Sequence, residues 1–163
     1  ESGCNTDMTR RYAYSLGGSR AVDSAPLSKP KNTTILSSIQ LDGTLHYTTF
    51  SGGTTVERFK QYLKTDLLPH LNGDSVLVMD NMKSHHAKAV KNLLDSSGVR
   101  YVYLPPYSPD LNPIEKLWSK VKSLLRKFKA RTLDALPNAI QNAFHSVTVS
   151  DCSGWFRFCG YAL

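Results

Sequence analysis

The sequence lacks long hydrophobic runs and has little cysteine, which excludes two large classes of protein. Its longest purely apolar runs are the length of a strand, such as residues 76–79, whereas a membrane-spanning helix needs roughly 20 apolar residues. No segment has the pattern of a signal peptide. The cysteines, Cys4, Cys152 and Cys159, are odd in number and fit neither a disulfide framework nor a zinc site. We therefore expect reduced thiols in a cytosolic protein.

Low-complexity tracts are also absent, so the composition indicates a folded chain. Apolar residues make up 40% of the 163 residues and charged residues 20%, as in soluble globular proteins. A chain of this length is the size of one ordinary domain with one core. The first residues, 1–5, show no capping, turn or targeting pattern. We expect them to come from the middle of a longer polypeptide.

Acidic residues are scarce relative to basic ones. Thirteen Asp and Glu stand against 20 Lys and Arg, which gives a net charge of +7 and an isoelectric point near 9.4. Residues 115–131 contain seven basic side chains and one acid, a local excess that accounts for nearly all of the net charge. Clustered positive charge favours a polyanionic partner. This segment is therefore the candidate nucleic-acid surface.

The first half of the chain predicts a hairpin followed by a helix. Residues 32–41 are rich in β-branched side chains, Asp42-Gly43 follows, and residues 45–50 continue the strand pattern, which is typical of two antiparallel strands around a tight turn. Thr54 then caps a helix whose apolar residues recur at helical spacing as far as Leu67, with Pro69 near its end.

The middle of the chain predicts a strand, a helix and a second strand. Residues 75–79 form a short continuous apolar run, as expected for a strand buried on both faces, and the run ends at Asp80-Asn81. A helix over about residues 88–96 ends at Gly98, and residues 99–104 form the second strand. This succession predicts a parallel pair joined by a right-handed crossover.

A proline-rich connector leads into the last part of the chain. Residues 104–113 contain four prolines, so the connector is stiff. Asn112 as N-cap, Pro113 as the first helical residue and Glu115 two residues later form a helix start. Seven apolar residues then lie on one stripe of this helix: Ile114, Leu117, Trp118, Val121, Leu124, Leu125 and Phe128. A helix over residues 133–146 and a short one containing residues 155–156 complete one α/β domain.

Two carboxylates stand where chemistry is expected. Reactive groups in open α/β sheets collect beyond the carboxyl ends of parallel strands, and Asp80 lies at such an end. Glu115 follows after 34 intervening residues. At 100° per residue it lies about 120° from the middle of the apolar stripe, on the side of Lys122 and Arg126. Carboxylates brought together from different elements can hold divalent cations.

Each of these residues also has a plainer interpretation. An acid in the first turn of a helix complements the helix dipole, which would make Glu115 a capping residue, and Asp80 alone would be a turn residue. His85 and His86 would be surface histidines, and a lysine-rich helical face is often only solvated. None of these signals is specific when it is taken singly.

A longer pattern is more specific. Residues 78–81, His85 and residues 103–122 closely resemble the bacterial insertion-sequence transposases of the mariner superfamily, which contain a DDE superfamily endonuclease domain. The resemblance extends over the whole chain and includes residues 1–3, 8–14, 155–156 and 159–161. It implies a ribonuclease H-like mixed sheet flanked by helices.

The resemblance also implies an activity and a site. The expected enzyme cleaves DNA strands and transfers them during transposition, and it uses two Mg²⁺ or Mn²⁺ ions held by two aspartates and a glutamate. Asp80 matches the second acid and Glu115 the third, with Asn81, His85 and Asn112 in supporting positions. The expected partners are transposon ends, target DNA and a second copy of the enzyme, in a bacterial cytoplasm at the nucleoid. Basic side chains of the following helix would contact phosphates: Lys116, Lys120, Lys122, Arg126, Lys127 and Lys129.

The first acid is where the sequence departs from the family pattern. It would directly precede Glu1, so we expect the first strand and the amino-terminal DNA-recognition region to be missing from residues 1–163. Glu1, Asp7 and Asp42 are poor substitutes for it. One alternative is therefore a catalytically inactive remnant that only binds nucleic acid or self-associates. A related ribonuclease H-like nuclease with another substrate fits the proline-rich stretch less well.

Overall fold

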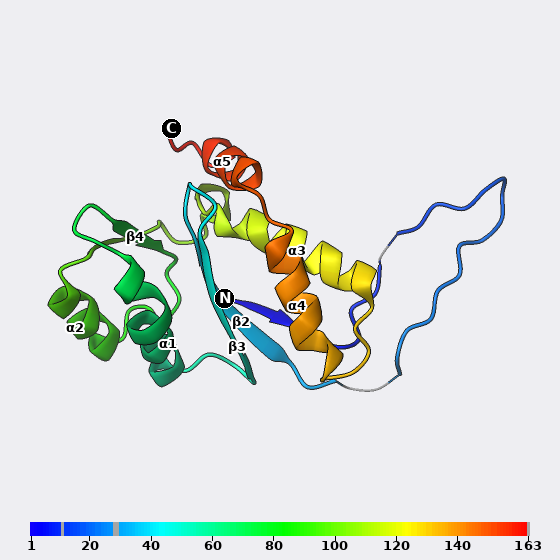
Figure 1. Ribbon diagram of the computed structural model, residues 1–163, viewed down its shortest axis with the longest axis horizontal. Coiled ribbons are helices and arrows are strands. Elements are labelled where there is room, and N and C mark those ends of the chain that lie inside the picture. The colour runs from blue at the N-terminus through cyan, green and yellow to red at the C-terminus, as the bar shows by residue number, and fades with distance from the viewer. Residues whose placement is uncertain (11, 28–29, 163) are drawn as a thin grey trace.

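Short β-strands form the centre of the protein, and helices flank them (Figure 1). The computed structural model describes residues 1–10, 12–27 and 30–162. Strands β1 (Ser2–Cys4), β2 (Thr33–Ile39) and β3 (Leu45–Ser51) form an antiparallel sheet in the order β1-β2-β3. Strands β4 (Val76–Met79) and β5 (Arg100–Tyr103) form a separate parallel pair. The mixed α/β class is therefore as predicted.

The predicted hairpin is confirmed by the pairing of β2 with β3. The register runs from Thr33 opposite Ser51 to Ile39 opposite Leu45. In the turn, the Gly43 N–H donates to the Gln40 carbonyl, and Gly43 has a φ of 89°, a left-handed value that favours glycine. The local sequence alone fixes this element.

The helix predicted after the hairpin is present in three geometries. Helix α1 (Val56–Tyr62) continues as a π-helical segment, η1 (Leu63–Leu67), and a 3₁₀ turn, η2 (Leu68–His70). Thr55, and not Thr54 as predicted, is the N-cap, because its backbone is extended and its hydroxyl accepts the Arg58 N–H at 3.3 Å.

The predicted strand, helix and strand are confirmed in the middle of the chain. Helix α2 (Lys88–Ser97) ends at Gly98, whose φ is 72°, and β4 pairs in parallel with β5. The prediction that β4 is buried on both faces is wrong. Leu77 and Met79 face a core that includes α1 and α2, whereas Val76 is 46% and Val78 38% exposed. The second face of this pair is open because Val102 of β5, beside Val78, is exposed as well.

Three helices follow the proline-rich connector. They are α3 (Ile114–Phe128), α4 (Ala135–His145) and α5 (Val149–Phe158), and a 3₁₀ turn, η3 (Pro109–Leu111), precedes them. The predicted N-cap is wrong: α3 begins after Pro113, and no side chain caps it. Asn112 is extended and receives the Glu115 N–H on its backbone carbonyl at 3.1 Å, so its side chain is not used for capping.

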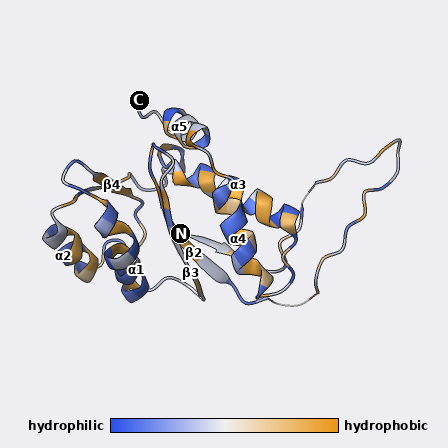
Figure 2. Cartoon of the chain, in the orientation of Figure 1, coloured by the Kyte–Doolittle hydropathy of each residue, from blue (hydrophilic) through white to orange (hydrophobic). Residues whose placement is uncertain are grey.

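The antiparallel sheet separates two apolar cores, because successive side chains of a strand point to opposite faces. Ile35 of β2 packs with buried residues of α3 and α4, whereas Leu36 packs with buried residues of α1, η1 and α2. The apolar stripe of α3 supplies Leu117, Trp118 and Val121 to the first core, and Figure 2 shows apolar and polar residues alternating along this helix. Within the described residues, no helix is long and apolar enough to cross a membrane.

Candidate active site

Asp80 and Glu115 line the same cavity, although 34 residues separate them in the sequence. The cavity has a volume of about 430 Å³. Asp80 comes from the residue after β4, and Glu115 from the first turn of α3. Asn81 and Asn112 line it too, and the proline-rich connector supplies most of the remaining wall: Leu104, Pro105, Pro106, Tyr107, Ser108 and Pro109. The fold therefore brings four of the five residues expected at the site to one cavity, and His85, the fifth, does not line it.

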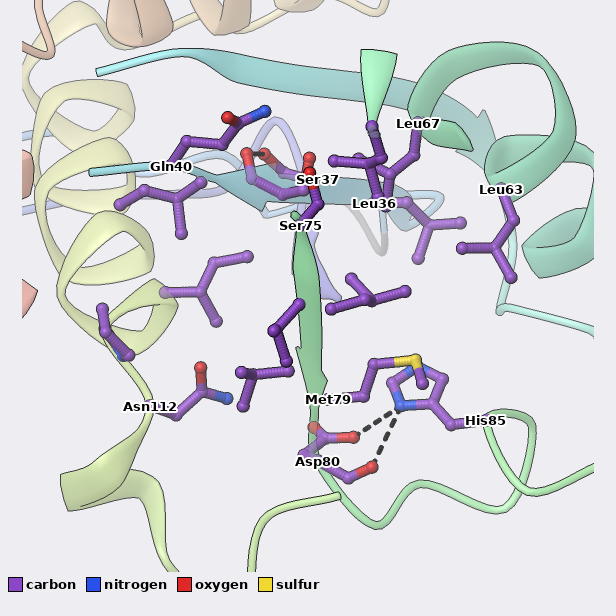
Figure 3. A pocket seen from close by; sticks show the side chains of 18 of the residues that line it. Leu36, Ser37, Gln40, Leu63, Leu67, Ser75, Met79, Asp80, His85 and Asn112 are labelled. Atoms are coloured by element: carbon purple, nitrogen blue, oxygen red, sulfur yellow. Dashed lines mark hydrogen bonds and ion pairs between the residues drawn. The ribbon is translucent and has the colours of Figure 1, made fainter. Parts of the chain in front are cut away.

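The Asp80 carboxylate is held in one orientation by its neighbours. Its Oδ1 lies 2.8 Å from Nδ1 of His85 (Figure 3). The same oxygen accepts the Met82 N–H at 3.1 Å. The hydrogen bond from His85 is the main cause that lowers the pKa of Asp80 from 3.8 to about 2. Burial opposes it as the second-largest effect, and the hydrogen bond from Met82 lowers the pKa further. The group is therefore a fixed negative charge at neutral pH.

His85 is buried beside Asp80 and is not a solvent-exposed histidine. It is only 6% exposed, and its ring stacks on Phe59 with 4.3 Å between centroids. Its backbone carbonyl accepts the Tyr103 hydroxyl at 2.9 Å. Because Nδ1 faces two acceptors, the Asp80 carboxylate and the Asp80 carbonyl at 3.2 Å, this nitrogen carries a proton. The stacking on Phe59 and the hydrogen bond from Tyr103 therefore hold His85 where its Nδ1 contacts Asp80.

Asn81 connects the end of β4 to the start of the proline-rich connector. Its amide nitrogen donates to the Leu104 carbonyl, and its amide oxygen lies 2.8 Å from Nε2 of His86. His86 in turn stacks on Tyr103 with 4.0 Å between ring centroids. These contacts link the residues that follow β4 to the end of β5 at the rim of the cavity.

The acids at this cavity are suited to a hard divalent cation, because carboxylate oxygens are the ligands that Mg²⁺ and Mn²⁺ prefer. Both hydrogen bonds to the Asp80 side chain end on Oδ1, which leaves Oδ2 available to a metal ion. Glu115 is exposed on α3 along the same stripe as Lys122 and Arg126. Over the residues that the structure covers, however, no three His, Cys, Asp or Glu side chains gather as a metal-binding group. The carboxylates of Asp80 and Glu115 suit a divalent cation, but they are only two ligands.

Half of the basic side chains predicted to contact phosphate already have partners in the protein. Lys120 forms an ion pair with Asp151 at 2.5 Å, and Lys129 pairs with Asp23 at 2.6 Å. Lys116 lies over the ring of Phe158, 3.8 Å from its centroid. Among the described residues, no ion pair involves the other three: Lys122, Arg126 and Lys127.

Sequence reasoning missed the aromatic residues that support the site. The ring of Phe59 packs against His85. Tyr103 contacts both His85 and His86. In the sequence these two residues look like ordinary members of a helix stripe and a strand, because no local pattern shows what lies across the fold from them. Only a register that places β5 beside β4 would have revealed the contacts of Tyr103.

A comparison with protein-family models matches residues 1–137 to the DDE superfamily endonuclease model. The chain belongs to the DDE superfamily endonucleases. It is 29% identical over 92 residues to the Transposable element Tc1 transposase of Caenorhabditis elegans, which covers 56% of this chain and 34% of that protein. It is 31% identical over 75 residues to the Transposable element Tcb2 transposase of Caenorhabditis briggsae, which covers 46% and 28%.

The fold of this DDE superfamily member resembles solved transposase structures. A Mos1 transposase paired-end complex with left transposon end superposes with a TM-score of 0.78 at 20% identity, over 96% of this chain and 49% of that one. A Mos1 strand transfer complex gives a TM-score of 0.76 at 19% identity, over 96% and 48%. The ribonuclease H-like fold class is thereby supported, and the chain spans about half or less of the length of these relatives.

Proposed function

We propose that this chain is the catalytic domain of a DNA transposase, which cleaves DNA strands and transfers them to a target. One observation carries the proposal: the family's second and third acids, Asp80 and Glu115, line one cavity, and a buried histidine fixes Asp80. Membership of the DDE superfamily endonucleases and the likeness to Tc1 and Mos1 transposases agree with it.

Asp80 and Glu115 would hold Mg²⁺ or Mn²⁺, two ions in the complete site. Mos1 paired-end complexes are described with Mn and with Mg, and hard carboxylate donors suit both ions. When bound, such ions activate a water or a 3′-hydroxyl and stabilise the leaving oxygen in phosphoryl transfer. The role of His85 and Met82 would be to keep Oδ1 of Asp80 occupied, so that Oδ2 faces the ion. Asn81 and Asn112 would hold the rim of the cavity.

The third carboxylate of the site would come from the position directly ahead of Glu1. This follows from the family pattern, and a second cavity, of about 310 Å³, is compatible with it, since both Glu1 and Asp80 line that cavity. Glu1 itself is the first substitute to consider. The proposed enzyme acts on transposon ends and target DNA as a homodimer in a bacterial cell, and Mos1 is described with a transposon end.

DNA phosphates would be bound along the polar surface of α3, which includes Glu115. Lys122, Arg126 and Lys127 are the foremost candidates, because they have no acidic partner within the described residues. The other three lysines could bind phosphate only after they break their present contacts. These contacts are Lys116 with Phe158, Lys120 with Asp151 and Lys129 with Asp23. A basic helix beside two carboxylates would place a phosphate next to the metal ions.

Nicking of supercoiled DNA tests the proposal in the protein extended by its own upstream coding sequence. We expect nicking that requires Mg²⁺ or Mn²⁺, and losses for Asp80→Asn and Glu115→Gln greater than the roughly 100-fold typical of residues around a metal ligand. The matched control is Asp110→Asn, an exposed acid of the same connector that does not line the cavity. Binding of DNA should survive all three changes.

The same assay distinguishes the alternative function. A remnant that only binds nucleic acid would bind DNA with ordinary salt dependence and show no metal-dependent nicking in the extended protein. Full activity of Asp80→Asn would instead mean that the cavity between β4 and α3 is not the active site.

A further inference from the structure

Tyr107 belongs to the wall of the cavity that Asp80 and Glu115 line, yet its side chain is bare. Its exposed fraction is 103%, so no other part of the described protein covers the ring. Single exposed apolar side chains are common on protein surfaces. Exposure by itself therefore assigns no role to this ring, and its backbone has to be considered as well.

The backbone of Tyr107 adopts a conformation that its side chain disfavours. Its φ is 55°, in the left-handed region that bulky residues rarely enter. Among the described residues other than glycine, only Lys129 shares this property. Lys129 ends α3, where a left-handed residue is usual, whereas Tyr107 lies between β5 and η3 and ends no helix. Glycine or asparagine would adopt this turn with less strain, so the turn alone does not account for a tyrosine.

The residues on both sides of Tyr107 hold this conformation in place. On the amino side, the Leu104 N–H donates to the last carbonyl of β4 at 2.8 Å, and Pro105 and Pro106 restrict their own φ angles. On the carboxyl side, the Ser108 hydroxyl donates to the Pro106 carbonyl at 3.3 Å. The connector, and not any contact of the ring, therefore determines where the Tyr107 side chain leaves the backbone.

A bare aromatic ring beside two carboxylates suits one part of a DNA strand better than the others. The carboxylates repel phosphates when no metal ion is bound, whereas a nucleobase is uncharged and has an apolar face. Stacking of a base on an aromatic side chain tolerates any sequence and stabilises the binding of unstacked nucleotides. The last base of a cut strand has one face free of neighbouring bases, so it can stack on a ring without disruption of the duplex.

We propose that Tyr107 is a substrate-binding residue of the proposed transposase, and that its ring stacks on the base at the reacting 3′ end of a DNA strand. The base and its 3′-hydroxyl belong to one nucleotide, so the stacked base holds the hydroxyl near the acids of the cavity, Asp80 and Glu115. The strained connector keeps the ring in place before DNA binds, which lowers the cost of ordering it. This inference rests on the proposed function and adds a contact to a base, where Lys122 and Arg126 would contact phosphates.

The fluorescence of 2-aminopurine tests the contact on the 163-residue protein and requires no catalysis. The probe is a short duplex with 2-aminopurine as its 3′-terminal base, because stacking on an aromatic ring quenches this fluorophore. We expect the protein to quench the terminal probe and to leave a probe in the middle of the same duplex nearly unchanged. Tyr107→Phe should retain the quenching, since the ring remains, and Tyr107→Asn should abolish it.

Tyr107→Asn separates the ring from the backbone, because asparagine tolerates the left-handed conformation. The variant should unfold at the same temperature as the unchanged protein or at a higher one. Its affinity for the duplex should fall by about tenfold, while the slope of log K against log salt stays the same because no charge is removed. The matched control is Tyr14→Ala, which removes an equally exposed ring that lines neither cavity and should leave the quenching unchanged.

Joining of a precut strand to a second duplex measures the consequence for the reaction in the extended protein. Tyr107→Asn should lower the rate of joining by about tenfold, as expected for the loss of one stacked base. Tyr107→Phe should join nearly as fast as the unchanged protein. A residue that served only to shape the connector would not show this rescue by phenylalanine.

Three results would overturn the proposal. These are equal quenching of the terminal and internal probes, quenching that Tyr107→Asn retains, and losses of joining that are equal in Tyr107→Phe and Tyr107→Asn. If Tyr107→Asn unfolds at a lower temperature, the two probes on the unchanged protein decide alone. Quenching that depends on Tyr107, in a chain whose extended form neither nicks nor joins DNA, would contradict the proposed function and leave the base contact standing.

Discussion

At the scale of single residues, the Asp80–His85 contact determines how the site responds to acid. The folded pKa of Asp80, about 2, lies below its ordinary value of 3.8. A carboxylate with a lowered folded pKa stabilises the protein above its unfolded pKa, and that contribution is lost as the pH falls through the folded value. The stability that the Asp80 carboxylate contributes is therefore lost between about pH 4 and pH 2.

Urea unfolding of the unchanged protein and of Asp80→Asn at pH 6 and pH 2.5 checks this expectation. We expect the variant to be less stable at pH 6 by about 1 kcal/mol or less, because the Asp80 side chain is 45% exposed and solvent screens the interaction. The difference should shrink at pH 2.5. For the control, Asp74→Asn in an exposed turn, the difference should be near zero at both values. If the stability difference for Asp80→Asn grew on acidification, the hydrogen bond between His85 and Asp80 would be contradicted.

His85 should act as a positioning residue, because it contacts Asp80 and lies buried against Phe59. In the extended protein, His85→Ala should lower metal-dependent nicking by about 10- to 100-fold, as for residues that orient a metal ligand. His85→Asn places an amide N–H near the position of Nδ1 and should restore much of the loss, which a purely structural role would not predict. His86→Ala should cost less. Nicking that is unchanged in His85→Ala would assign His85 to packing only.

At the scale of elements, α3 should carry the electrostatic part of DNA binding. The affinity of a protein that neutralises phosphates falls with salt, with a slope near −0.9 for each contact. The double variant Lys122→Ala, Arg126→Ala should therefore reduce the magnitude of the slope of log K against log salt by about 1.8. Filter binding or anisotropy at several salt concentrations measures it.

Two control pairs sharpen the measurement. Lys60→Ala with Lys64→Ala removes the same charge from α1 and η1 and should leave the slope unchanged. Lys120→Ala with Lys129→Ala should have a smaller effect than the α3 pair, because both lysines are bound to acids. Equal slopes for the unchanged protein and the Lys122, Arg126 pair would place the DNA surface elsewhere.

The elements that the sequence predicted are those whose signals are local. The Asp42-Gly43 turn, the glycine at the end of α2 and the apolar stripe of α3 each lie within a few residues of the element they determine. The predictions were wrong where a feature depends on residues that are distant in the sequence. Asn112 was expected to cap α3 but accepts a hydrogen bond on its backbone carbonyl instead. The exposure of Val78 depends on what covers the second face of the β4–β5 pair.

The sequence could indicate which residues to consider for the candidate site, but not how they are arranged. The family pattern singled out Asp80, Glu115 and His85, and the fold brings the two acids to one cavity. The partners of Lys120 and Lys129 were not foreseeable, since Asp151 is 31 residues away and Asp23 is 106. Such pairs follow from the arrangement of α5 and of the segment after β1, for which the local sequence gives no signal.

At the scale of the whole molecule, the number of carboxylates at the cavity governs metal binding. Divalent ions need several oxygen ligands and charge compensation, and within the described residues Asp80 and Glu115 have no third acid close enough to form a group with them. Two acids should leave at least one ion weakly held. The 163-residue protein should therefore bind Mn²⁺ at least about tenfold more weakly than an extended protein that carries the acid proposed ahead of Glu1.

Calorimetric titration with Mn²⁺ measures this difference, and replacement of the added acid by its amide in the extended protein is the control. That control keeps the added residues and removes only the ligand charge, so it separates the effect of the carboxylate from the effect of lengthening the chain. We expect the amide variant to be as stable as the extended protein but to bind Mn²⁺ as weakly as residues 1–163 alone, and to nick supercoiled DNA barely above background. Robust Mn²⁺-dependent nicking by the 163 residues, lost on Asp80→Asn, would show that two ions can be held without an added acid. Glu1 would then be the first residue to replace, because it lines the same cavity as Asp80.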